Sequence, residues 1–367
     1  MKFNIQRDEL LPGIQTVNGV IERRHTLPIL SNLLLSVGRN GIKLTGTDME
    51  VELIYNIKQG ANEESEFTLP SRKLLDICRA LPEGSGLDFQ VDKDQVVLRS
   101  GKSRFTLATL PAKDYPGTEI SDPLVEFDIT QGELKTLVED TMFAMAQQDV
   151  RYYLNGLLLE AGNNKLRAVA TDGHRLALKE IEKNIAVKEM LQIIVPRKGV
   201  LEISRLLSNT EEETVGVQIS KNHIRLKINN IQFTSKLIDG KFPDYERVIP
   251  KMSETPLLAG RDALKQSLTR ASILSNEKYK GVRIILKKDS LKAIAHNPEQ
   301  EEAEEELEVK YAGNEMEIGF NVTYLLDAIN AIKTENVIMT TTNPDSSCLL
   351  LPEGKNNYKY VVMPMRL

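Results

Sequence analysis

The chain of 367 residues lacks the features that mark several specialised classes of protein. Its two cysteines, Cys78 and Cys348, stand in no metal-like or redox spacing, and its four histidines lie far apart in the sequence. A disulfide framework and a zinc finger are therefore not expected. No apolar run approaches the ~20 residues of a membrane-spanning helix, and the N-terminal residues MKFNIQRDELL lack the apolar stretch of a signal peptide. We expect a soluble, cytoplasmic protein with no membrane partner.

The common catalytic motifs are absent as well. The sequence contains no HExxH, no GxSxG and neither of the glycine-rich loops GxxxxGK[ST] and GxGxxG that hold phosphates. The sequence therefore contains none of the phosphate-binding motifs that nucleotide hydrolysis commonly uses. We expect neither a metal nor a cofactor. The balance of 47 basic against 52 acidic residues, with both signs mixed, does not by itself indicate a nucleic-acid partner.

What the sequence does contain is an internal repeat. When the chain is shifted against itself by 124 residues, Phe3 and Ile5 fall on Phe127 and Ile129. The same shift carries Leu33-Leu34-Leu35 onto Leu157-Leu158-Leu159 and Thr47-Asp48 onto Thr171-Asp172, and a fainter third copy matches Leu264 to Leu134 and Leu291 to Leu166. The copies meet at turn-rich stretches, 116–123 and 244–256. We therefore predict three domains, at 1–122, 123–253 and 254–367.

Each copy is predicted to hold two helices and six to eight strands. An opening strand leads into a helical segment, two strands around a turn, a second helix and closing strands that alternate apolar and polar residues. The first helices are expected at 7–21, 131–145 and 261–274, and the second at 71–81, 197–207 and 322–332. This content predicts an α+β fold with the helices packed on one side of antiparallel sheets.

One segment allows a catalytic interpretation. Asp172 and His174 stand two residues apart, and a metal-dependent phosphoesterase or nuclease using Asp48, Asp172 and His174 is our alternative hypothesis. Acid–base chemistry needs a further group that orients the imidazole, and the sequence identifies none. Asp172-Gly173 between β-prone residues is a common hairpin signal, and the equivalent turn, Asp48-Met49, has neither the glycine nor the histidine. We therefore favour a hairpin turn.

Two further segments suggest surfaces for partners. Residues 299–308 include seven glutamates, which form either a solvated face or flexible tail, or an ordered acidic edge. Basic residues in the first copy, among them Lys73 and Arg104, could meet such an edge head-to-tail between subunits, and a contact of this kind that closes makes a ring. The C-terminal residues YVVMPMRL are apolar for a chain end, which predicts a core strand or an exposed apolar surface for a peptide.

Several of these segments resemble one family, the bacterial β sliding clamps, which are the processivity subunits of the replicative DNA polymerase. The resemblance spans the whole chain. It is carried by TLPILSNLLL (26–35), QDVRYYLNG (148–156), ATDGHRL (170–176), FTSKLIDGKFPDY (233–245), NPEQEEAEE (297–305) and YVVMPMRL (360–367), among others.

The resemblance implies a fold and a function. It implies three similar domains of the DNA clamp fold in each chain and a head-to-tail homodimer that closes into a ring around duplex DNA. Such a ring catalyses no reaction. It binds replicative and other DNA polymerases and holds them on the DNA, and it also binds a clamp loader. Its contacts with DNA need read no base, so they are expected to be non-specific and salt-dependent.

Site residues carry over by position. The family's peptide pocket, which receives short linear motifs of polymerases and the clamp loader, matches Leu154, Thr171, Gly173, His174, Arg175, Leu176, Pro243, Arg247, Val248, Asn321, Tyr324, Ser347, Val361, Met363, Pro364, Met365 and Arg366. Asp345 departs from the pattern, because well-known members have an apolar residue there.

The resemblance also implies a DNA contact and a dimer contact. Positions implicated in DNA contact match Arg24, Gln148, Tyr152 and Tyr153, and the cationic surplus of the second helices adds Arg197 and Lys198 as our own candidates. The dimer contact matches Lys73, Phe105, Leu107, Ile273, Leu274, Glu301 and Glu304. A scaffold that binds only proteins remains a further alternative, and it would show no salt-sensitive association with DNA.

Overall fold

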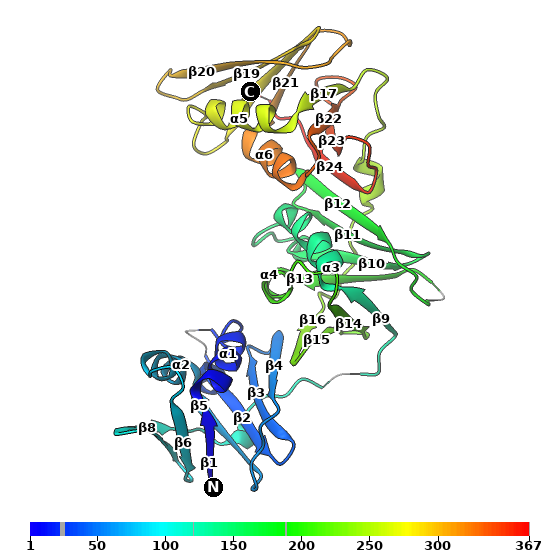
Figure 1. Ribbon diagram of the computed structural model, residues 1–367. Helices are drawn as coiled ribbons and strands as arrows, with labels where there is room; N and C mark the ends of the chain where they lie inside the picture. The colour runs from blue at the N-terminus through cyan, green and yellow to red at the C-terminus, as the bar shows by residue number, and fades with distance from the viewer. Residues whose placement is uncertain (23–25, 120, 188, 367) are drawn as a thin grey trace. The chain divides into compact units, whose positions relative to one another are not determined.

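The computed structural model describes residues 1–22, 26–119, 121–187 and 189–366 (Figure 1). The described residues form twenty-four strands and six α-helices, and eight strands and two α-helices fall in each of the three sequence copies. All strand pairs in the four sheets are antiparallel. The predicted α+β class and the content of each copy are therefore confirmed. No helix among these residues is long and apolar enough to cross a membrane.

The chain divides into two compact units, and the first comprises residues 1–132 and 201–237. It holds a four-stranded sheet in the order β1 (Lys2–Gln6), β6 (Gly86–Val91), β7 (Gln95–Ser100), β8 (Ser103–Ala108). It also holds an eight-stranded sheet in the order β5 (Ser65–Pro70), β2 (Asn32–Gly38), β3 (Gly41–Thr47), β4 (Val51–Ile57), β16 (Ile231–Lys236), β15 (His223–Ile228), β14 (Thr214–Ile219), β9 (Val125–Thr130). Helices α1 (Arg7–Val17) and α2 (Ser71–Ala80) pack against each other and against these sheets.

The second unit comprises residues 133–200 and 238–367. Its eight-stranded sheet has the order β13 (Leu191–Pro196), β10 (Gly156–Gly162), β11 (Lys165–Thr171), β12 (Arg175–Glu182), β24 (Tyr358–Val362), β23 (Cys348–Pro352), β22 (Asn336–Thr340), β17 (Leu257–Gly260). Its four-stranded sheet has the order β20 (Glu302–Glu308), β19 (Ser290–His296), β18 (Gly281–Lys287), β21 (Met316–Asn321). Helices α5 (Arg261–Ser272) and α6 (Val322–Ala331) lie side by side near these strands (Figure 1).

The middle sequence copy is shared between the two large sheets. Strand β4 pairs with β16, with Leu53 opposite Phe233, so the closing strands of the middle copy extend the sheet of the first copy. Strand β12 pairs with β24, with Leu176 opposite Val361, so the opening strands of the middle copy join the third copy. Contiguous repeats in the sequence are thus not separate sheets in the structure.

The helices begin where the sequence predicts, and all six end earlier than expected, α1 by four residues, α3 by six and the others by one or two. Helix α2 buries Leu74, Leu75 and Cys78 and exposes Arg72 and Lys73, which is the amphipathic pattern that predicts it. Helix α1 ends at Val17 instead of continuing to residue 21. The helix predicted at 131–145 is divided into α3 (Gln131–Glu139) and a short 3₁₀ helix, η3 (Met142–Ala144).

The break after α3 has a local cause. The Thr141 hydroxyl donates to the carbonyls of Leu137 and Val138, at 2.8 and 3.2 Å. The backbone of Thr141, with φ −129°, leaves the helical region. A threonine that bonds to the preceding turn in this way competes with the regular helix, so the chain turns here.

Candidate functional site

The seventeen residues predicted to bind peptides, called here the candidate surface, all lie in the second unit. Three of them, Leu154, Leu176 and Val361, belong to one buried apolar cluster. The pairing of β12 with β24 brings Leu176 and Val361 opposite each other, although 185 residues separate them in the sequence. Because this cluster is continuous with the core, the base of the candidate surface is rigid.

The C-terminal segment continues past β24 along the same part of the unit. The N–H of Met363 donates to the carbonyl of His174 at 2.9 Å, and the N–H of Met365 donates to the carbonyl of Gly319 at 2.8 Å. Val361 is buried, while the side chains of Met363, Pro364 and Met365 are half-buried. The segment is therefore a core strand followed by a backbone-anchored extension with partly exposed apolar side chains, so both predicted alternatives describe part of it.

The turn between β11 and β12 is held by its own side chains. The Asp172 carboxylate accepts the N–H groups of His174 and Arg175, at 2.9 and 3.0 Å. The Thr171 hydroxyl accepts the N–H of Gly173 at 3.1 Å and donates to the carbonyl of Arg175 at 2.6 Å. Gly173 has φ +88°, which glycine adopts without the cost that a Cβ would bring. The predicted hairpin turn is confirmed, and it presents His174 to solvent.

Arg175 connects this turn to helix α6. Its guanidinium pairs with the Asp172 carboxylate at 3.1 Å and with Asp327 of α6, and it donates to the carbonyl of Phe143 at 2.7 Å. The guanidinium carbon also lies 4.4 Å from the centre of the Tyr324 ring, which is cation–π geometry. With its donors engaged on several sides, Arg175 is a fixed part of the candidate surface.

A polar network holds the segment that carries Pro243, Arg247 and Val248. The Tyr245 hydroxyl donates to buried Glu160 at 2.6 Å and accepts from Arg167 at 2.7 Å. Burial raises the pKa of the Tyr245 hydroxyl, so it stays protonated as a donor. Tyr245 opens a short 3₁₀ helix, η5 (Tyr245–Val248), on which Arg247 and Val248 are exposed. Tyr245 therefore anchors an otherwise exposed part of the candidate surface to β10 and β11.

The remaining members of the candidate surface differ in burial and in local structure. Asn321 caps α6, because its side chain accepts the N–H groups of Thr323 and Tyr324 at 2.9 and 3.3 Å. Ser347 is half-buried just before β23, and Asp345 is exposed in the turn that precedes it. Arg366 is exposed.

Sequence reasoning missed the residues that support this surface. Asp327 and Phe143 hold Arg175, and Arg167 with Glu160 holds Tyr245. The Arg175–Asp327 pair spans 152 residues and the Tyr245–Glu160 pair spans 85. No local sequence signal marks either pair, because their partners meet only when the sheets form.

The residues of the alternative catalytic hypothesis have structural roles. Asp172 holds the turn described above, and Asp48 holds the equivalent turn in the first unit by accepting the N–H groups of Glu50 and Val51, at 2.9 and 2.7 Å. Among the described residues, no group of three His, Cys, Asp or Glu could hold a metal ion. Both cysteines are buried, and burial raises the pKa of the Cys78 thiol to about 11, which disfavours the reactive thiolate.

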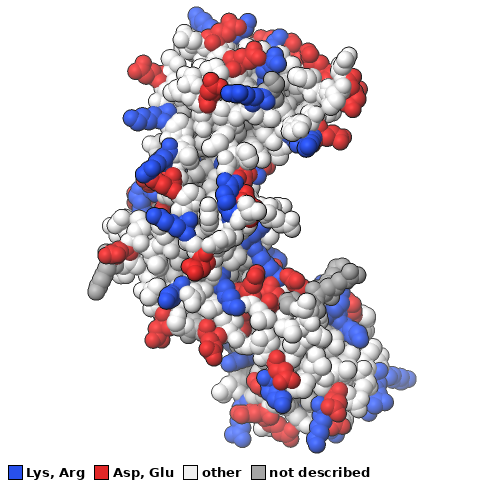
Figure 2. All heavy atoms as spheres, turned by 180° about the vertical axis from the view of Figure 1, so that it is seen from behind, with Lys and Arg blue, Asp and Glu red and all other residues white. Residues whose placement is uncertain are grey.

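Apart from Arg24, the residues predicted to contact DNA lie on the loop before β10 and at the start of helix α4 (Arg197–Leu206). Tyr152 is 56% exposed, and its ring meets that of Tyr153 edge-on with centres 5.7 Å apart. Gln148 is exposed with φ +54°, and neighbouring Val150, which the sequence did not suggest, is 95% exposed. Arg197 and Lys198 are half-buried, and Arg24 lies outside the described residues. On the face drawn in Figure 2, basic and acidic side chains are interspersed.

The residues predicted to form a dimer contact include members of two edge strands, β8 and β20. In the first unit, β8 is an edge strand that carries Phe105 and Leu107, and Lys73 is exposed on α2. Leu107 is 7% exposed and so already belongs to the core of its own unit. In the second unit, the acidic run is ordered as the edge strand β20, preceded by Glu301.

Ionic contacts and an exposed apolar side chain surround this acidic edge. Glu304 pairs with Lys292 at 2.6 Å, and Glu305 pairs with Arg270 of α5. Ile273, at the end of α5, is 74% exposed, and Leu274 is half-buried. Of the alternatives that the sequence left open for the acidic run, the structure shows the ordered acidic edge.

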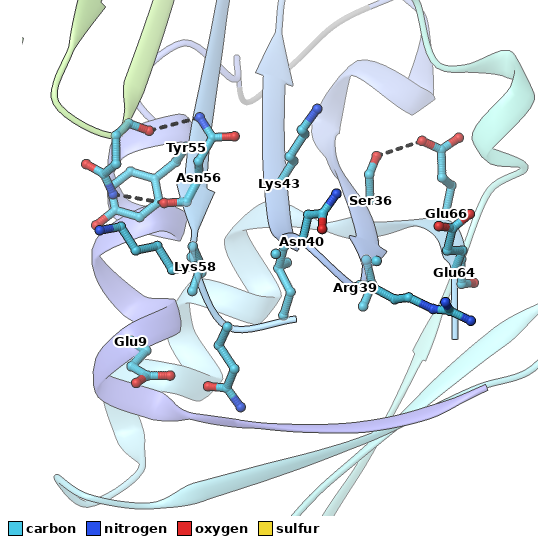
Figure 3. Close-up of a pocket in the computed structure, with 18 of the residues that line it drawn as sticks. Glu9, Ser36, Arg39, Asn40, Lys43, Tyr55, Asn56, Lys58, Glu64 and Glu66 are labelled. Carbon is cyan, nitrogen blue, oxygen red and sulfur yellow. Dashed lines mark hydrogen bonds between the residues drawn. The ribbon is translucent and has the colours of Figure 1, made fainter. Parts of the chain in front are cut away.

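A wide hollow of about 1320 Å³ lies elsewhere in the first unit, at the ends of β2, β3 and β4 beside α1 (Figure 3). Its wall includes a hydrogen bond from Ser36 to Glu66 at 2.7 Å and one from the Asn56 amide to the backbone of Asn230 at 3.1 Å. Charges of both signs line it, including Glu9 and Lys58. Among the described residues, none of those predicted for a site contributes to this wall, so the hollow does not belong to the predicted surfaces.

Comparisons with known proteins match the chain from end to end. Models of the DNA polymerase III beta subunit match its N-terminal domain at residues 1–119, its central domain at 128–244 and its C-terminal domain at 246–366. The beta sliding clamps of Pseudomonas putida and Escherichia coli K12 are 50% and 49% identical to it over 368 residues, covering all of both chains.

Solved structures agree with the sequence relatives. A crystal structure of the DNA polymerase sliding clamp from Pseudomonas aeruginosa with ligand superimposes with a TM-score of 0.97 at 49% identity, with full coverage of both chains. The sliding clamp of Bartonella birtlesii bound to griselimycin gives a TM-score of 0.96 at 34% identity, also with full coverage. The likeness therefore extends to every domain of the chain.

Proposed function

The chain belongs to the family of DNA polymerase III beta subunits, the beta sliding clamps, and from this premise we propose which of its surfaces serve the function. The chain acts in DNA replication as a non-catalytic processivity clamp, with DNA and DNA polymerases as its partners. The observation that carries this conclusion is the match to all three family domains in order along one chain. We further propose that it works in the cytoplasm and that its domains lie at 1–122, 123–253 and 254–367.

Two chains close head-to-tail, with β8 of one meeting β20 of the other. Both are edge strands with one unpaired side, and an unpaired edge is a ready template for a second chain. Arg104 of β8 and Lys73 are basic, whereas β20 carries Glu304 and Glu306, so the two edges are complementary in charge. Ile273 adds an exposed apolar anchor beside the acidic edge. A closed contact of this kind generates a ring with two copies of every site.

DNA passes through the ring and touches it weakly. Tyr152 and Gln148 are exposed on one loop with Tyr153 beside them, and Arg197 and Lys198 open helix α4 nearby in the same unit. Arg24 is part of the proposal as well. Polar and cationic side chains that contact phosphates hold a duplex without reading its sequence, which is what sliding requires.

Short linear motifs of polymerases and the clamp loader bind the candidate surface. Its buried apolar base, formed by Leu154, Leu176 and Val361, supports the partly exposed Met363, Pro364 and Met365. These three side chains offer contacts for apolar anchors, and Arg175 with His174 supplies a polar rim. Asp345 places a negative charge beside Ser347, so motifs with a basic residue at this end should bind better than motifs with an acidic one.

Retention on DNA tests the function directly. The chain is loaded onto nicked circular duplex by a clamp loader from one of the Pseudomonas relatives, and retention is measured by gel filtration before and after linearisation. We expect retention on the circle, loss from the linear form, and no cleavage with Mg²⁺ present. Equal retention on both forms would contradict encirclement, and cleavage that Asp172→Ala removes would establish the nuclease instead.

The dimer contact needs its own test. Ile273→Asp combined with Leu274→Asp should give monomers by analytical ultracentrifugation, because two charges would be placed in the centre of the contact. Leu201→Asp, at an exposed position of α4 outside both proposed contact edges, controls for general effects of charge. A persistent dimer in the double variant would place the interface elsewhere.

A further inference from the structure

A buried ion pair fastens the end of helix α3 to β12, the strand that begins with Arg175. The Lys179 ammonium donates to the Asp140 carboxylate at 2.6 Å, and the two side chains are only 3% and 6% exposed. The ammonium also lies 4.3 Å from the centre of the Tyr358 ring, which is cation–π geometry. Asp140 directly follows α3, and Tyr358 lies opposite Lys179 on β24. The pair therefore holds the end of α3, β12 and β24 together.

The stability of the fold does not by itself explain this pair. Removing two charges from water costs free energy that their attraction only partly offsets, so apolar side chains of similar volume often replace a buried ion pair without loss of stability. Asp140 is also poorly placed for α3, because the C-terminal end of a helix carries a partial negative charge. A role in fixing the position of the chain explains the pair better than a gain in stability does.

Lys179 and Arg175 both reach the chain segment that follows α3. Side chains alternate along a strand, so these two cations point to the same face of β12. Leu176 points to the other face, where it belongs to the buried apolar cluster. Lys179 contacts Asp140, and Arg175 donates to the carbonyl of Phe143 at 2.7 Å. One strand thus holds the segment at two points that are three positions apart in the sequence.

The segment that contains these two points is short and closely packed, and it is called here the α3–η3 segment (140–144). The Thr141 hydroxyl donates back to α3, and the N–H of Ala144 donates to the carbonyl of Thr141 at 3.1 Å. The Phe143 ring packs against that of Tyr360 with centres 5.7 Å apart, and Tyr360 is buried. Because the segment is held this closely, a displacement of Asp140 also moves the Phe143 carbonyl.

The Phe143 carbonyl is one of three acceptors that fix the Arg175 guanidinium. The other two are the carboxylates of Asp172, in the turn before β12, and of Asp327, on α6. The Phe143 ring adds a contact, because the guanidinium carbon lies 5.5 Å from its centre. Without the carbonyl, the guanidinium would be held from two sides instead of three, and it would lose part of its fixed orientation.

We propose that Asp140 and Lys179 are positioning residues for peptide binding. Their ion pair keeps the α3–η3 segment where the Phe143 carbonyl fixes Arg175 at the rim of the candidate surface. Both side chains are buried, so they act without touching the peptide. Arg175 is pre-organised in this way and loses less conformational freedom when a motif binds. The proposal rests on the proposed binding of short linear motifs to the candidate surface.

An apolar pair tests the proposal in the full chain. Asp140→Leu combined with Lys179→Met removes both charges and keeps the space filled, so the melting temperature should stay near that of the native chain. Binding of a fluorescein-labelled peptide from a Pseudomonas DNA polymerase, followed by fluorescence anisotropy, should weaken about tenfold, because Arg175 is no longer pre-organised. Native affinity in the folded double variant would overturn the proposal.

A cycle of variants shows whether the pair acts through Arg175. In a chain that carries Arg175→Gln, adding the apolar pair should change the peptide affinity by less than about twofold, because the group that the pair positions is gone. The same weakening in both backgrounds would overturn the proposal. If the apolar pair does not fold, Asp140→Asn takes its place, since it keeps the side-chain shape and removes the charge. It should weaken binding about threefold or more when Arg175 is present, and native affinity in Asp140→Asn would be equally decisive against the proposal.

A second ion pair between the same parts of the chain supplies the matched control. Lys183, just past the end of β12, pairs with Glu133 of α3 at 3.8 Å. Lys183→Gln removes this pair and should bind the peptide as the native chain does. An equal weakening in Lys183→Gln would show that any loosening of α3 has this effect, and the proposal would be wrong. A native chain that binds no peptide would overturn the proposed peptide binding itself, whereas native affinity in the folded apolar pair would overturn the positioning role alone.

Discussion

Two equivalent turns, one in each unit, share the same hydrogen bonds and differ in what they support. In the first unit, Thr47 and Asp48 hold the turn before β4, and in the second, Thr171 and Asp172 hold the turn before β12. In both, the carbonyl two residues past the aspartate accepts an N–H from a distant strand end: Lys236 donates to Glu50 at 2.8 Å, and Met363 donates to His174 at 2.9 Å. The repeat therefore preserves the turn together with the distant strand end that bonds to it, and this combination is called here a junction.

The side chains around these junctions have diverged. Val51 follows the first turn and is buried, whereas the corresponding Arg175 reaches out to Asp327 and Tyr324. After the first junction the chain continues as Lys236 and Leu237, and after the second as Met363 and Pro364. The same backbone hydrogen bonds thus hold a purely structural contact in the first unit and part of the proposed peptide-binding surface in the second. The two junctions differ in their side chains.

The largest expected effect comes from exchanging residues between the junctions. Leu176 corresponds to Glu52, and Leu176→Glu would bury a carboxylate in an apolar cluster that offers it no partner. We expect a loss of roughly 3 to 5 kcal/mol in the free energy of unfolding, measured by urea denaturation. Leu176→Met, which keeps the volume, should cost less than about 1.5 kcal/mol. A similar stability for both variants would show that the cluster is less tightly packed than described.

A surface charge should separate binding from stability. Met363→Asp, at a half-buried position after β24, should weaken the binding of a polymerase-derived peptide by about 2 kcal/mol or more while leaving the melting temperature nearly unchanged. Fluorescence anisotropy with a labelled peptide measures the affinity, and Lys236→Asp at the other junction is the matched control. Full affinity in Met363→Asp would contradict the assignment of the peptide surface.

The two aspartates should both contribute to stability. Asp48→Ala and Asp172→Ala each remove two hydrogen bonds to backbone N–H groups, a loss of roughly 1 to 3 kcal/mol. Asp172→Ala also removes an ion pair to Arg175. Thermal unfolding of both variants measures the two losses, and an unchanged stability in either variant would contradict the role of that aspartate in its turn.

Backbone strain offers a smaller test. Met49 occupies the same left-handed conformation as Gly173, with φ +78° against +88°. Met49→Gly should therefore stabilise the chain by up to about 1 kcal/mol, whereas Gly173→Ala should destabilise it by a similar amount. A Cβ at residue 173 would also lie 3.0 Å from the Arg151 guanidinium. Changes of the same sign in both variants, measured by urea denaturation, would contradict this account.

The smallest effect is the pH dependence that Glu52 contributes. Burial raises the pKa of this carboxyl, with Thr118 and Arg225 opposing the shift, so the folded chain retains a proton that the unfolded chain loses. Its contribution to stability is therefore greatest below the unfolded pKa and declines as the pH rises through the folded pKa. Glu52→Gln should gain stability relative to the native chain as the pH is raised from 4 to 7. If the free energy of unfolding of Glu52→Gln fell relative to that of the native chain over this pH range, the direction of the pKa shift would be wrong.

Much of the fold follows from local sequence patterns. The starts of all six helices and the turn at Asp172-Gly173 were predicted from spacing and residue type. For the acidic run the sequence left two alternatives open, and only the structure shows it as the strand β20. The ends of α1 and α3 were not, because they depend on details such as the Thr141 hydroxyl, which a hydrophobic period does not reveal. The members of the candidate surface came from resemblance to a family, and their contacts came from the structure.

By itself, the sequence determined the number of copies, the elements within each and the turns that join neighbouring strands. These depend on propensities and hydrogen bonds that act over a few residues. Tertiary structure alone decided that the middle copy is divided between two sheets and that Arg175 meets Asp327. Backbone ladders accept many partners, so the choice of partner is made only when apolar faces and free edges from distant segments come together.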